Sequence, residues 1–302
     1  MSLGIVFSGG GTCGVYQLGF WKALKEYGLD KKVTAVSGSS VGTLNALLYA
    51  NGDLELALDI WTNLKTADLF RVREGMTGMG VFSQEGYGAF IDRLEYNWEN
   101  TRKGIPIYAC VSSLGKKGEN LDNVDLIKRL GGKPEYILLN RRKFKSMKKV
   151  ALASTAIPYV YPRRLVGSEI CIDGDFSDKT PYKPLIEWGC DKVIVLHLNT
   201  VEESSHRQAE YDGDTIPESD ARLYHLYPKE TLGFIMAVSE DIINDRLKRG
   251  YEEGQEFLEK YHSLLCADAK NRELYRFERS DRTCQRSTTI NEVTDWRQQI
   301  YS

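Results

Sequence analysis

A serine framed by two glycines is the residue of this chain best suited to act as a nucleophile. The segment Gly38-Ser39-Ser40-Val41-Gly42 has the pattern Gly-x-Ser-x-Gly, typical of a nucleophile elbow, a sharp strand-to-helix turn that exposes the serine oxygen. The same pattern also occurs by chance, as a tight turn with a helix-capping serine. The flanks favour the elbow, because residues 33–37 are strand-like and residues 44–50 are helix-like. The spacing selects Ser40 over Ser39.

A second glycine-rich turn lies earlier in the chain. Residues 8–14 read Ser-Gly-Gly-Gly-Thr-Cys-Gly, a row of backbone N–H groups that can face a developing negative charge. With a nucleophilic serine, this turn indicates acyl transfer. The turn of residues 9–14 also matches the dinucleotide fingerprint Gly-x-Gly-x-x-Gly, so a nucleotide-binding protein is the alternative function. The acidic residue that this fingerprint requires after the second strand is missing, because that strand ends in Ser37-Gly38.

A serine nucleophile needs a base, and the candidate is Asp173, which stands between a strand-like run and Gly174. Such an aspartate is expected on a turn at the edge of the sheet, where it can also be an ordinary turn residue. Because the usual pKa of aspartate is about 4, catalysis would require a water-poor pocket that raises its basicity. A Ser-Asp-His triad remains the alternative, because the four histidines all follow Asp173: His197, His206, His225 and His262.

Strand-like and helix-like segments alternate around these residues. Strands are expected over residues 3–7, 33–37, 105–111, 136–139, 170–172, 192–198 and 223–226, and helices over residues 15–24, 44–50, 54–64, 144–153, 184–188 and 239–265. This alternation predicts an α/β fold with a mainly parallel central sheet and helices on both faces. Residues 66–88 are rich in glycine and read as a loop with exposed apolar side chains.

Four landmarks in order make the chain resemble a patatin-like phospholipase: the glycine turn, the elbow, residues 153–158 (Ala-Ser-Thr-Ala-Ile-Pro), and Asp173-Gly174. Residues 248–254 also resemble a Gly-Tyr-x-x-Gly helix of bacterial members. The resemblance implies a three-layer α/β/α sandwich and a lipid acyl hydrolase of the phospholipase A or lysophospholipase type. It implies a Ser40–Asp173 dyad that works through an acyl-enzyme. It also implies an oxyanion hole formed by the N–H groups of Gly9, Gly10 and Gly11.

Two residues depart from the family pattern. Cys13 stands where the glycine loop of the family usually carries arginine or lysine, and Asp175 stands where a glycine or alanine usually follows Asp173-Gly174. A missing cation near the oxyanion could lower the rate or change the head-group preference. A second carboxylate near Asp173 could raise the pKa of one of the two.

The composition suits a folded, globular protein. The chain of 302 residues has a formal charge of −2, which gives no case for a nucleic-acid partner. Its six cysteines lack metal-ligand spacing, so we expect no metal, disulfide framework or cofactor. Without a signal peptide or a membrane-length apolar run, we expect a cytoplasmic protein that contacts a membrane peripherally through its phospholipid or lysophospholipid substrate. A basic cluster at residues 141–149 is either a solvated helix start or a site for anionic head groups.

The expected organisation is a hydrolase domain over residues 1–261, followed by a polar, helical extension of unknown role over residues 262–302. The sequence leaves the oligomeric state open.

Overall fold

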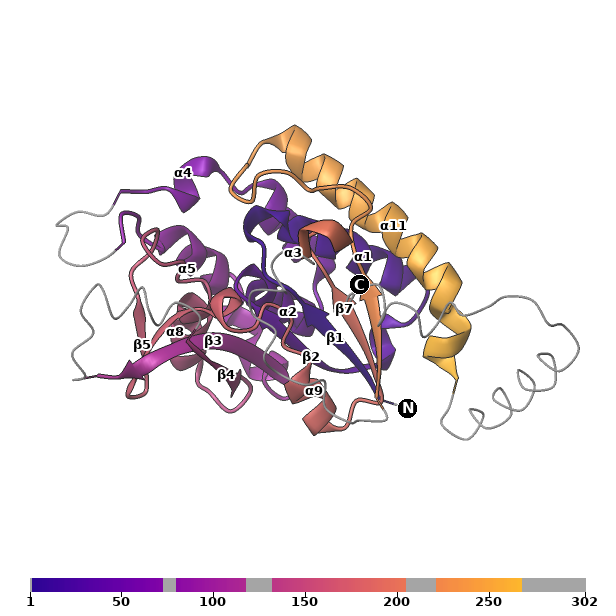
Figure 1. Cartoon of the computed structure of the whole chain (residues 1–302), viewed down its shortest axis with the longest axis horizontal. Coiled ribbons are helices and arrows are strands. Elements are labelled where there is room, and N and C mark those ends of the chain that lie inside the picture. Colours follow the sequence, from indigo (N-terminus) through magenta and orange to yellow (C-terminus); the bar gives the residue numbers. More distant parts are fainter. Residues whose placement is uncertain (1, 73–79, 118–131, 205–220, 268–302) are drawn as a thin grey trace, which may run out of the picture.

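The computed structural model describes residues 2–72, 80–117, 132–204 and 221–267, in which helices flank a single β-sheet (Figure 1). The strands are β1 (Leu3–Phe7), β2 (Val33–Ser39), β3 (Ile107–Lys116), β4 (Lys133–Leu138), β5 (Arg164–Val166), β6 (Glu169–Asp173), β7 (Lys192–Leu196) and β8 (Arg222–Leu226). The helices are α1 (Val15–Glu26), α2 (Val41–Asn51), α3 (Leu54–Thr62), α4 (Thr66–Leu69), α5 (Glu85–Asp92), α6 (Trp98–Thr101), α8 (Phe144–Ser154), α9 (Lys183–Trp188) and α11 (Glu240–Cys266).

The sheet is mainly parallel, as the alternating pattern predicts. Its order is β5-β6-β3-β2-β1-β7-β8, with β4 paired to β3 outside this path. The strands β3, β2, β1, β7 and β8 run parallel, whereas β4, β5 and β6 pair antiparallel with their neighbours. Because β1 and β2 are adjacent and parallel, with Phe7 opposite Gly38, the glycine turn after β1 and the elbow after β2 emerge at the same edge of the sheet.

Strand β3 places the fourth landmark, Asp173-Gly174, at that edge. One side of β3 pairs first with β2, where Cys110 is opposite Ser39, and then with β6, where Val111 is opposite Asp173. The end of β2 and the end of β6 therefore meet head to head along β3. This arrangement brings Ser40 and Asp173 together although 133 residues separate them in the chain.

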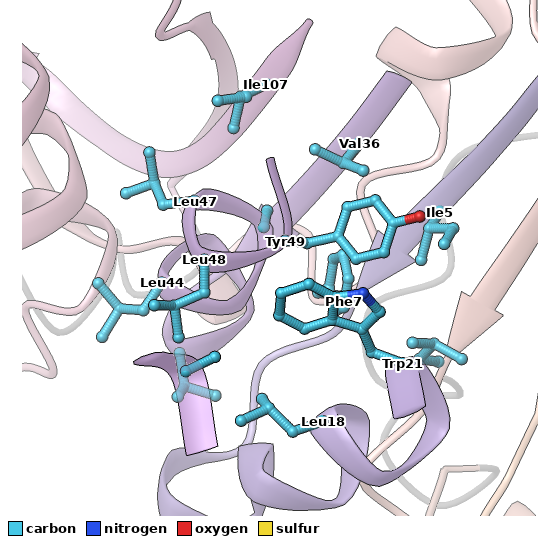
Figure 2. Packing of buried hydrophobic residues seen from close by; sticks show 14 of the residues in the cluster. Ile5, Phe7, Leu18, Trp21, Val36, Leu44, Leu47, Leu48, Tyr49 and Ile107 are labelled. Carbon is cyan, nitrogen blue, oxygen red and sulfur yellow. The ribbon is translucent and has the colours of Figure 1, made fainter. Parts of the chain in front are cut away.

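The core lies mainly on one face of the sheet. Along β1, Ile5 and Phe7 point into a large cluster shared with α1, α2, α3 and α11, whereas Val6 points to a smaller cluster with Leu185 of α9. Figure 2 shows the large cluster, in which Phe7 and Trp21 pack around Tyr49 with ring centroids 5.8 and 5.1 Å from that of Tyr49. The alternation of side chains along β1 thus produces the layers of the α/β/α sandwich.

Helix α11 packs along α1 on the outside of the molecule (Figure 1). Ser239 caps its first turn by accepting a hydrogen bond from the Ile242 N–H. The helix continues through residue 261 to Cys266, and Lys192 Nζ donates to the Leu265 and Ala267 carbonyls. The chain is thus helical across the expected domain boundary at residues 261–262. None of the described helices has both the length and the apolar character that crossing a bilayer demands.

The prediction of a loop over residues 66–88 is partly wrong. Its two ends form α4 and the start of α5, and Val72 bridges to Phe82 as an isolated pair. Tyr87 and Phe90, at most 6% exposed, pack into the core and stabilise α5 despite its two glycines. Val81 is 45% exposed, which agrees with the prediction of exposed apolar side chains in this segment. Met76 and Met79 lie outside the described residues.

Candidate active site

Ser40 lies at the sharp turn that the Gly-x-Ser-x-Gly pattern predicts. Its backbone has φ 50° and ψ −126°, a conformation that L-residues seldom adopt outside strained functional turns. The turn is compatible only with small neighbours, because a Cβ on Gly42 would overlap the Phe7 carbonyl and one on Gly38 would overlap the Gly42 carbonyl. Ser40 is 5% exposed and directly precedes α2, so its oxygen sits at the positive end of that helix.

Ser154 holds the elbow from the last turn of α8. Its Oγ accepts a hydrogen bond of 3.1 Å from the Ser40 N–H and donates one of 2.6 Å to the Cys110 carbonyl on β3. The Ser40 N–H is thereby fixed by a side chain that is itself anchored to the sheet. Ser154 belongs to the motif at residues 153–158, whose role the pattern alone did not reveal.

Asp173 contacts Ser40 directly. The Ser40 hydroxyl donates a 2.6 Å hydrogen bond to Asp173 Oδ2, and the Asp175 N–H donates one of 2.9 Å to Oδ1. The backbone of Asp173 is also fixed, because its N–H donates to the Ala156 carbonyl and its carbonyl accepts from Ser112 Oγ. Asp173 is 1% exposed. The structure therefore holds a buried carboxylate within proton-transfer distance of the candidate nucleophile.

Burial raises the pKa of Asp173 well above its usual range, and the neighbouring charge of Asp175 raises it further. The hydrogen bonds from Ser40 and the Asp175 N–H, and the charge of Lys179, act in the opposite direction. A carboxylate with a raised pKa is a better base than free aspartate. This environment is the water-poor pocket that a dyad without histidine would require.

Replacing Asp175 with asparagine removes one of the two causes that raise the pKa of Asp173. Asp173 must be ionised to accept a proton, so a lower pKa keeps it active at lower pH. We expect the acid limb of kcat/KM to move to lower pH in Asp175→Asn, measured by titrating esterase activity. Asp59→Asn removes an equal charge from the exposed pair with Arg93 and is the control. An acid limb that stays in place in both variants would contradict the coupling.

The glycine turn faces the same edge of the sheet, but its N–H groups are not equivalent. Gly9 N–H donates to the Lys179 carbonyl at 3.3 Å. In the described part of the chain, the N–H groups of Gly10 and Gly11 donate no hydrogen bond. The structure thus engages the Gly9 N–H elsewhere, and Gly10 and Gly11 remain the candidate oxyanion donors.

Two buried amide side chains fix the glycine turn from below. Gln17 Nε2 donates to the Ser8 and Leu196 carbonyls, and Asn45 Nδ2 donates to the Gly14 carbonyl and to Gln17 Oε1. Both residues are at most 1% exposed. Sequence reasoning missed them, although a glutamine within the otherwise apolar run 15–21 and an asparagine within the otherwise apolar run 44–50 are the available signal.

Arg246 of α11 brings a cation to the turn that lacks one at position 13. Its Nη1 donates to Thr12 Oγ1 at 2.9 Å, next to Cys13, and Arg246 is 1% exposed. Cys13 is equally buried, and burial raises the pKa of its thiol while the Arg246 charge opposes the rise. Sequence reasoning missed Arg246, but it falls in the apolar stripe of α11, three residues after Ile243 and four before Gly250.

Arg246→Lys is expected to lower kcat by about tenfold. The lysine keeps the charge but cannot reproduce the planar fork that bonds Thr12 and the nearby carbonyls, so the glycine turn loses its fixed position. Because Arg246 would act on the turn, KM for a short-chain ester should change little. Lys248→Met removes an exposed cation two residues further along α11 and is the control. An equal kcat in Arg246→Lys and the wild type would contradict this positioning role.

Among the described residues, no histidine forms a hydrogen bond with Ser40 or Asp173. His197 Nε2 and His225 Nδ1 are 2.8 Å apart, and the His197 ring stacks on Tyr227. Burial lowers the pKa of His197 well below its usual range and that of His225 to about 4. A distance of 2.6 Å between Ser40 Oγ and Asp173 leaves no room for an imidazole between them. His262 lies on α11, and His206 is outside the described residues.

The glycine turn is also poorly arranged for a dinucleotide. The Asp175 carboxylate packs against Gly9, where a Cβ would overlap it, and the Ile235 carbonyl covers Gly11 in the same way. A pyrophosphate spread over this turn would meet the carboxylate beside Gly9 and the carbonyl oxygen beside Gly11, and both would repel its charge. The end of β2, where an acidic residue would hold the ribose, is the elbow itself.

The basic cluster lies at the opposite end of α8 from Ser154. Arg141, Arg142 and Lys143 line a shallow hollow at the start of this helix, together with residues of β4. Lys148 pairs with Asp92. A helix rises about 1.5 Å per residue, so the start of α8 is about 15 Å from the elbow. Four of the cysteines, at positions 13, 110, 171 and 190, are free and buried.

Comparisons with known proteins bear on the family and the fold. The curated relatives include the lysophospholipase NTE1 of Cryptococcus neoformans, which is 24% identical over 210 residues, covering 68% of this chain and 12% of that protein. VipD from Legionella pneumophila has a similar structure, with a TM-score of 0.54, 14% identity, and coverage of 85% of this chain and 66% of VipD. Human GIVD cytosolic phospholipase A2 gives a TM-score of 0.52 at 10% identity, covering 87% of this chain and 62% of the enzyme.

At such low identity the solved structures speak for the fold alone, and this chain spans only 12% of the length of the curated relative. The family profile "Patatin-like phospholipase" is broader evidence, because it matches residues 5–186, more than half of the 302 residues. That stretch contains the glycine turn, the elbow, the residues that fix it and Asp173. The chain therefore belongs to the family of patatin-like phospholipases.

Proposed function

We propose that this protein hydrolyses fatty-acyl ester bonds of phospholipids or lysophospholipids with a Ser40–Asp173 dyad. The observation that carries the proposal is the 2.6 Å hydrogen bond from Ser40 Oγ, on a strained elbow, to a buried carboxylate with a raised pKa. Family membership supports the lipid ester as the substrate class. The names of two similar proteins, a lysophospholipase and a cytosolic phospholipase A2, support the phospholipid class.

The proposed reaction has two steps. In the first, Ser40 Oγ attacks the ester carbonyl carbon while Asp173 takes the hydroxyl proton, and the N–H groups of Gly10 and Gly11 bind the oxyanion. The alcohol leaves with the proton from Asp173, and the acyl chain stays on Ser40. In the second, Asp173 takes a proton from water as the water attacks the acyl-enzyme; the bond between the acyl carbon and Ser40 Oγ then breaks, Asp173 returns the proton to Ser40 Oγ, and the fatty acid is released.

Lipid profiling tests the proposed substrate class. Purified protein is incubated with phosphatidylcholine and with lysophosphatidylcholine, and released fatty acids are measured by mass spectrometry. Labelling with a fluorophosphonate in parallel should modify Ser40, identified by peptide mapping. If neither lipid is cleaved, Ser40 is not labelled, and a nucleotide raises the Tm, the protein is a nucleotide-binding protein that uses the turn of residues 9–14.

A double substitution separates the dyad from a Ser-Asp-His triad. His197→Gln with His225→Gln keeps polar groups in the buried pair, and we expect esterase kcat to remain within about threefold of the wild type. Loss of a triad base would cost far more, about 10²–10⁴-fold. A loss of that size in a variant that remains folded by circular dichroism would favour the triad.

A further inference from the structure

The segment between β8 and α11 presents two large apolar side chains to solvent. Residues 232–238 read Leu-Gly-Phe-Ile-Met-Ala-Val and carry no charge, and we name them the apolar loop. Phe234 is 72% exposed and Ile235 is 43% exposed. Figure 1 shows this segment in orange at the upper edge of the molecule, leading into α11. Single exposed apolar side chains are common. A functional role for this loop must therefore be argued from the hydrogen bonds that hold it and from the residues that it contacts.

A buried guanidinium holds the backbone of the apolar loop. Arg246 Nε donates to the Leu232 carbonyl at 2.9 Å, Nη2 to the Phe234 carbonyl at 2.9 Å, and Nη1 to the Ala237 carbonyl at 3.2 Å. Leu232 is 6% exposed and anchors the start of the loop in the core. Because the carbonyls turn inward to the arginine, the loop is a fixed feature that holds the Phe234 and Ile235 side chains outward.

The apolar loop adjoins the candidate oxyanion donors. The Thr12 N–H donates to the Ile235 carbonyl at 2.7 Å, and Thr12 Oγ1 donates to the Ala237 carbonyl at 2.8 Å. Thr12 directly follows Gly11 in the glycine turn. The loop that exposes Phe234 is therefore hydrogen-bonded to the residue next to the proposed oxyanion hole.

A second exposed apolar side chain lies three residues after the backbone partner of Asp173. Tyr159 is 47% exposed, and it follows Ala156, whose carbonyl accepts the Asp173 N–H. Exposed apolar groups thus stand beside the oxyanion turn and beside the base. For a lipid hydrolase, this edge of the sheet is where a fatty-acyl ester must arrive from a membrane.

We propose that Phe234 and Ile235 insert into the acyl region of a lipid bilayer and dock this edge of the sheet on the membrane. The inference rests on the proposed function and names the surface through which the substrate reaches the dyad. An uncharged loop gains from burial of its side chains and gains nothing from anionic head groups. Docking should therefore occur on neutral phosphatidylcholine vesicles.

Vesicle flotation tests docking without hydrolysis. Both proteins compared carry Ser40→Ala, so the lipid stays intact. One has the wild-type apolar loop and the other carries Phe234→Ser and Ile235→Ser, and each is floated with phosphatidylcholine vesicles. We expect the double substitution to weaken the partition into vesicles by at least about tenfold. Trp188→Ser removes an aromatic side chain of 51% exposure on α9, on the opposite face of the sheet, and should leave partitioning unchanged.

A second readout separates docking from chemistry. With Ser40 intact, the Phe234→Ser protein, in which Ile235 is unchanged beside the glycine turn, should hydrolyse a water-soluble short-chain ester at the wild-type rate and vesicle lipid several-fold more slowly. Equal partitioning of the wild-type and double-substituted loops would overturn the docking proposal. So would wild-type protein that ignores vesicles and instead associates with itself through Phe234 and Ile235. Partitioning without hydrolysis of either substrate would keep docking and reject the proposed function.

Discussion

Ser40→Ala is expected to lower kcat for fatty-acid release by about 10³–10⁶-fold. The Ser40 hydroxyl is the group that donates to Asp173 at 2.6 Å and stands at the start of α2, so its removal leaves no attacking oxygen. Any residual rate above the uncatalysed rate of hydrolysis in water would come from the oxyanion donors and from substrate binding. The measurement is the initial rate with a short-chain ester and with lysophosphatidylcholine.

Ser39 provides a matched control at the neighbouring position. It is fully buried, its Oγ has no hydrogen-bond partner among the described residues, and it lies on the sheet side of the elbow. Ser39→Ala removes a buried hydroxyl without a partner, so stability should not fall and kcat should remain near that of the wild type. Similar losses in Ser39→Ala and Ser40→Ala would indicate that the elbow has collapsed. Full activity in Ser40→Ala would reject Ser40 as the nucleophile.

The same variant must lose fluorophosphonate labelling. The reagent forms a covalent bond with an activated serine oxygen, and Ser40→Ala lacks the oxygen that the strained elbow presents. Labelling that persists in Ser40→Ala and disappears in Ser39→Ala would move the nucleophile by one residue, against the spacing of the motif.

The mainly parallel sheet and the elbow turn could be predicted from sequence because their determinants are local. The strand-like runs in β1, β2 and β7 are buried on both faces, so they lack alternation and read as parallel strands. The elbow needs Gly38 and Gly42 at fixed spacing, and that need is visible as a motif. The pairing of Ser40 with Asp173 was supplied by the family resemblance, because no local pattern encodes the head-to-head meeting of β2 and β6 along β3.

Long-range contacts explain what the sequence did not predict. The Gly9 N–H donates to the Lys179 carbonyl, 170 residues away in the chain, and no sequence motif predicts the conformation of the segment around Lys179. Arg246 reaches Thr12 across 234 residues, and only its place in the apolar stripe of α11 hints at burial. The helical ends of residues 66–88 were missed because glycine suggests a loop, whereas tertiary packing of Tyr87 and Phe90 overrides that preference.

Asp173→Asn is expected to lower kcat by about 10²–10⁴-fold. The amide keeps the shape of the carboxylate, because its Oδ1 can accept the Asp175 N–H while Nδ2 donates to Ser40 Oγ. It cannot take a proton from the serine, so acylation loses its base. The check is the rate of acyl-enzyme formation in single-turnover experiments, with KM measured alongside to show that substrate binding persists.

The same substitution should stabilise the fold at neutral pH. Burial and Asp175 raise the pKa of Asp173 in the folded protein. Between the pKa of this carboxyl in the unfolded chain and its higher pKa in the folded protein, mainly the unfolded chain loses the proton, so the free energy of unfolding falls as pH rises. Each unit of upward shift corresponds to about 1.4 kcal/mol. Asparagine cannot ionise and escapes this loss. The gain in Tm of Asp173→Asn over the wild type should therefore be absent below about pH 4 and grow as pH rises. If Asp173→Asn were less stable than the wild type at every pH, the Asp173 carboxylate would stabilise the fold, and this would contradict its proposed role as a destabilised buried base.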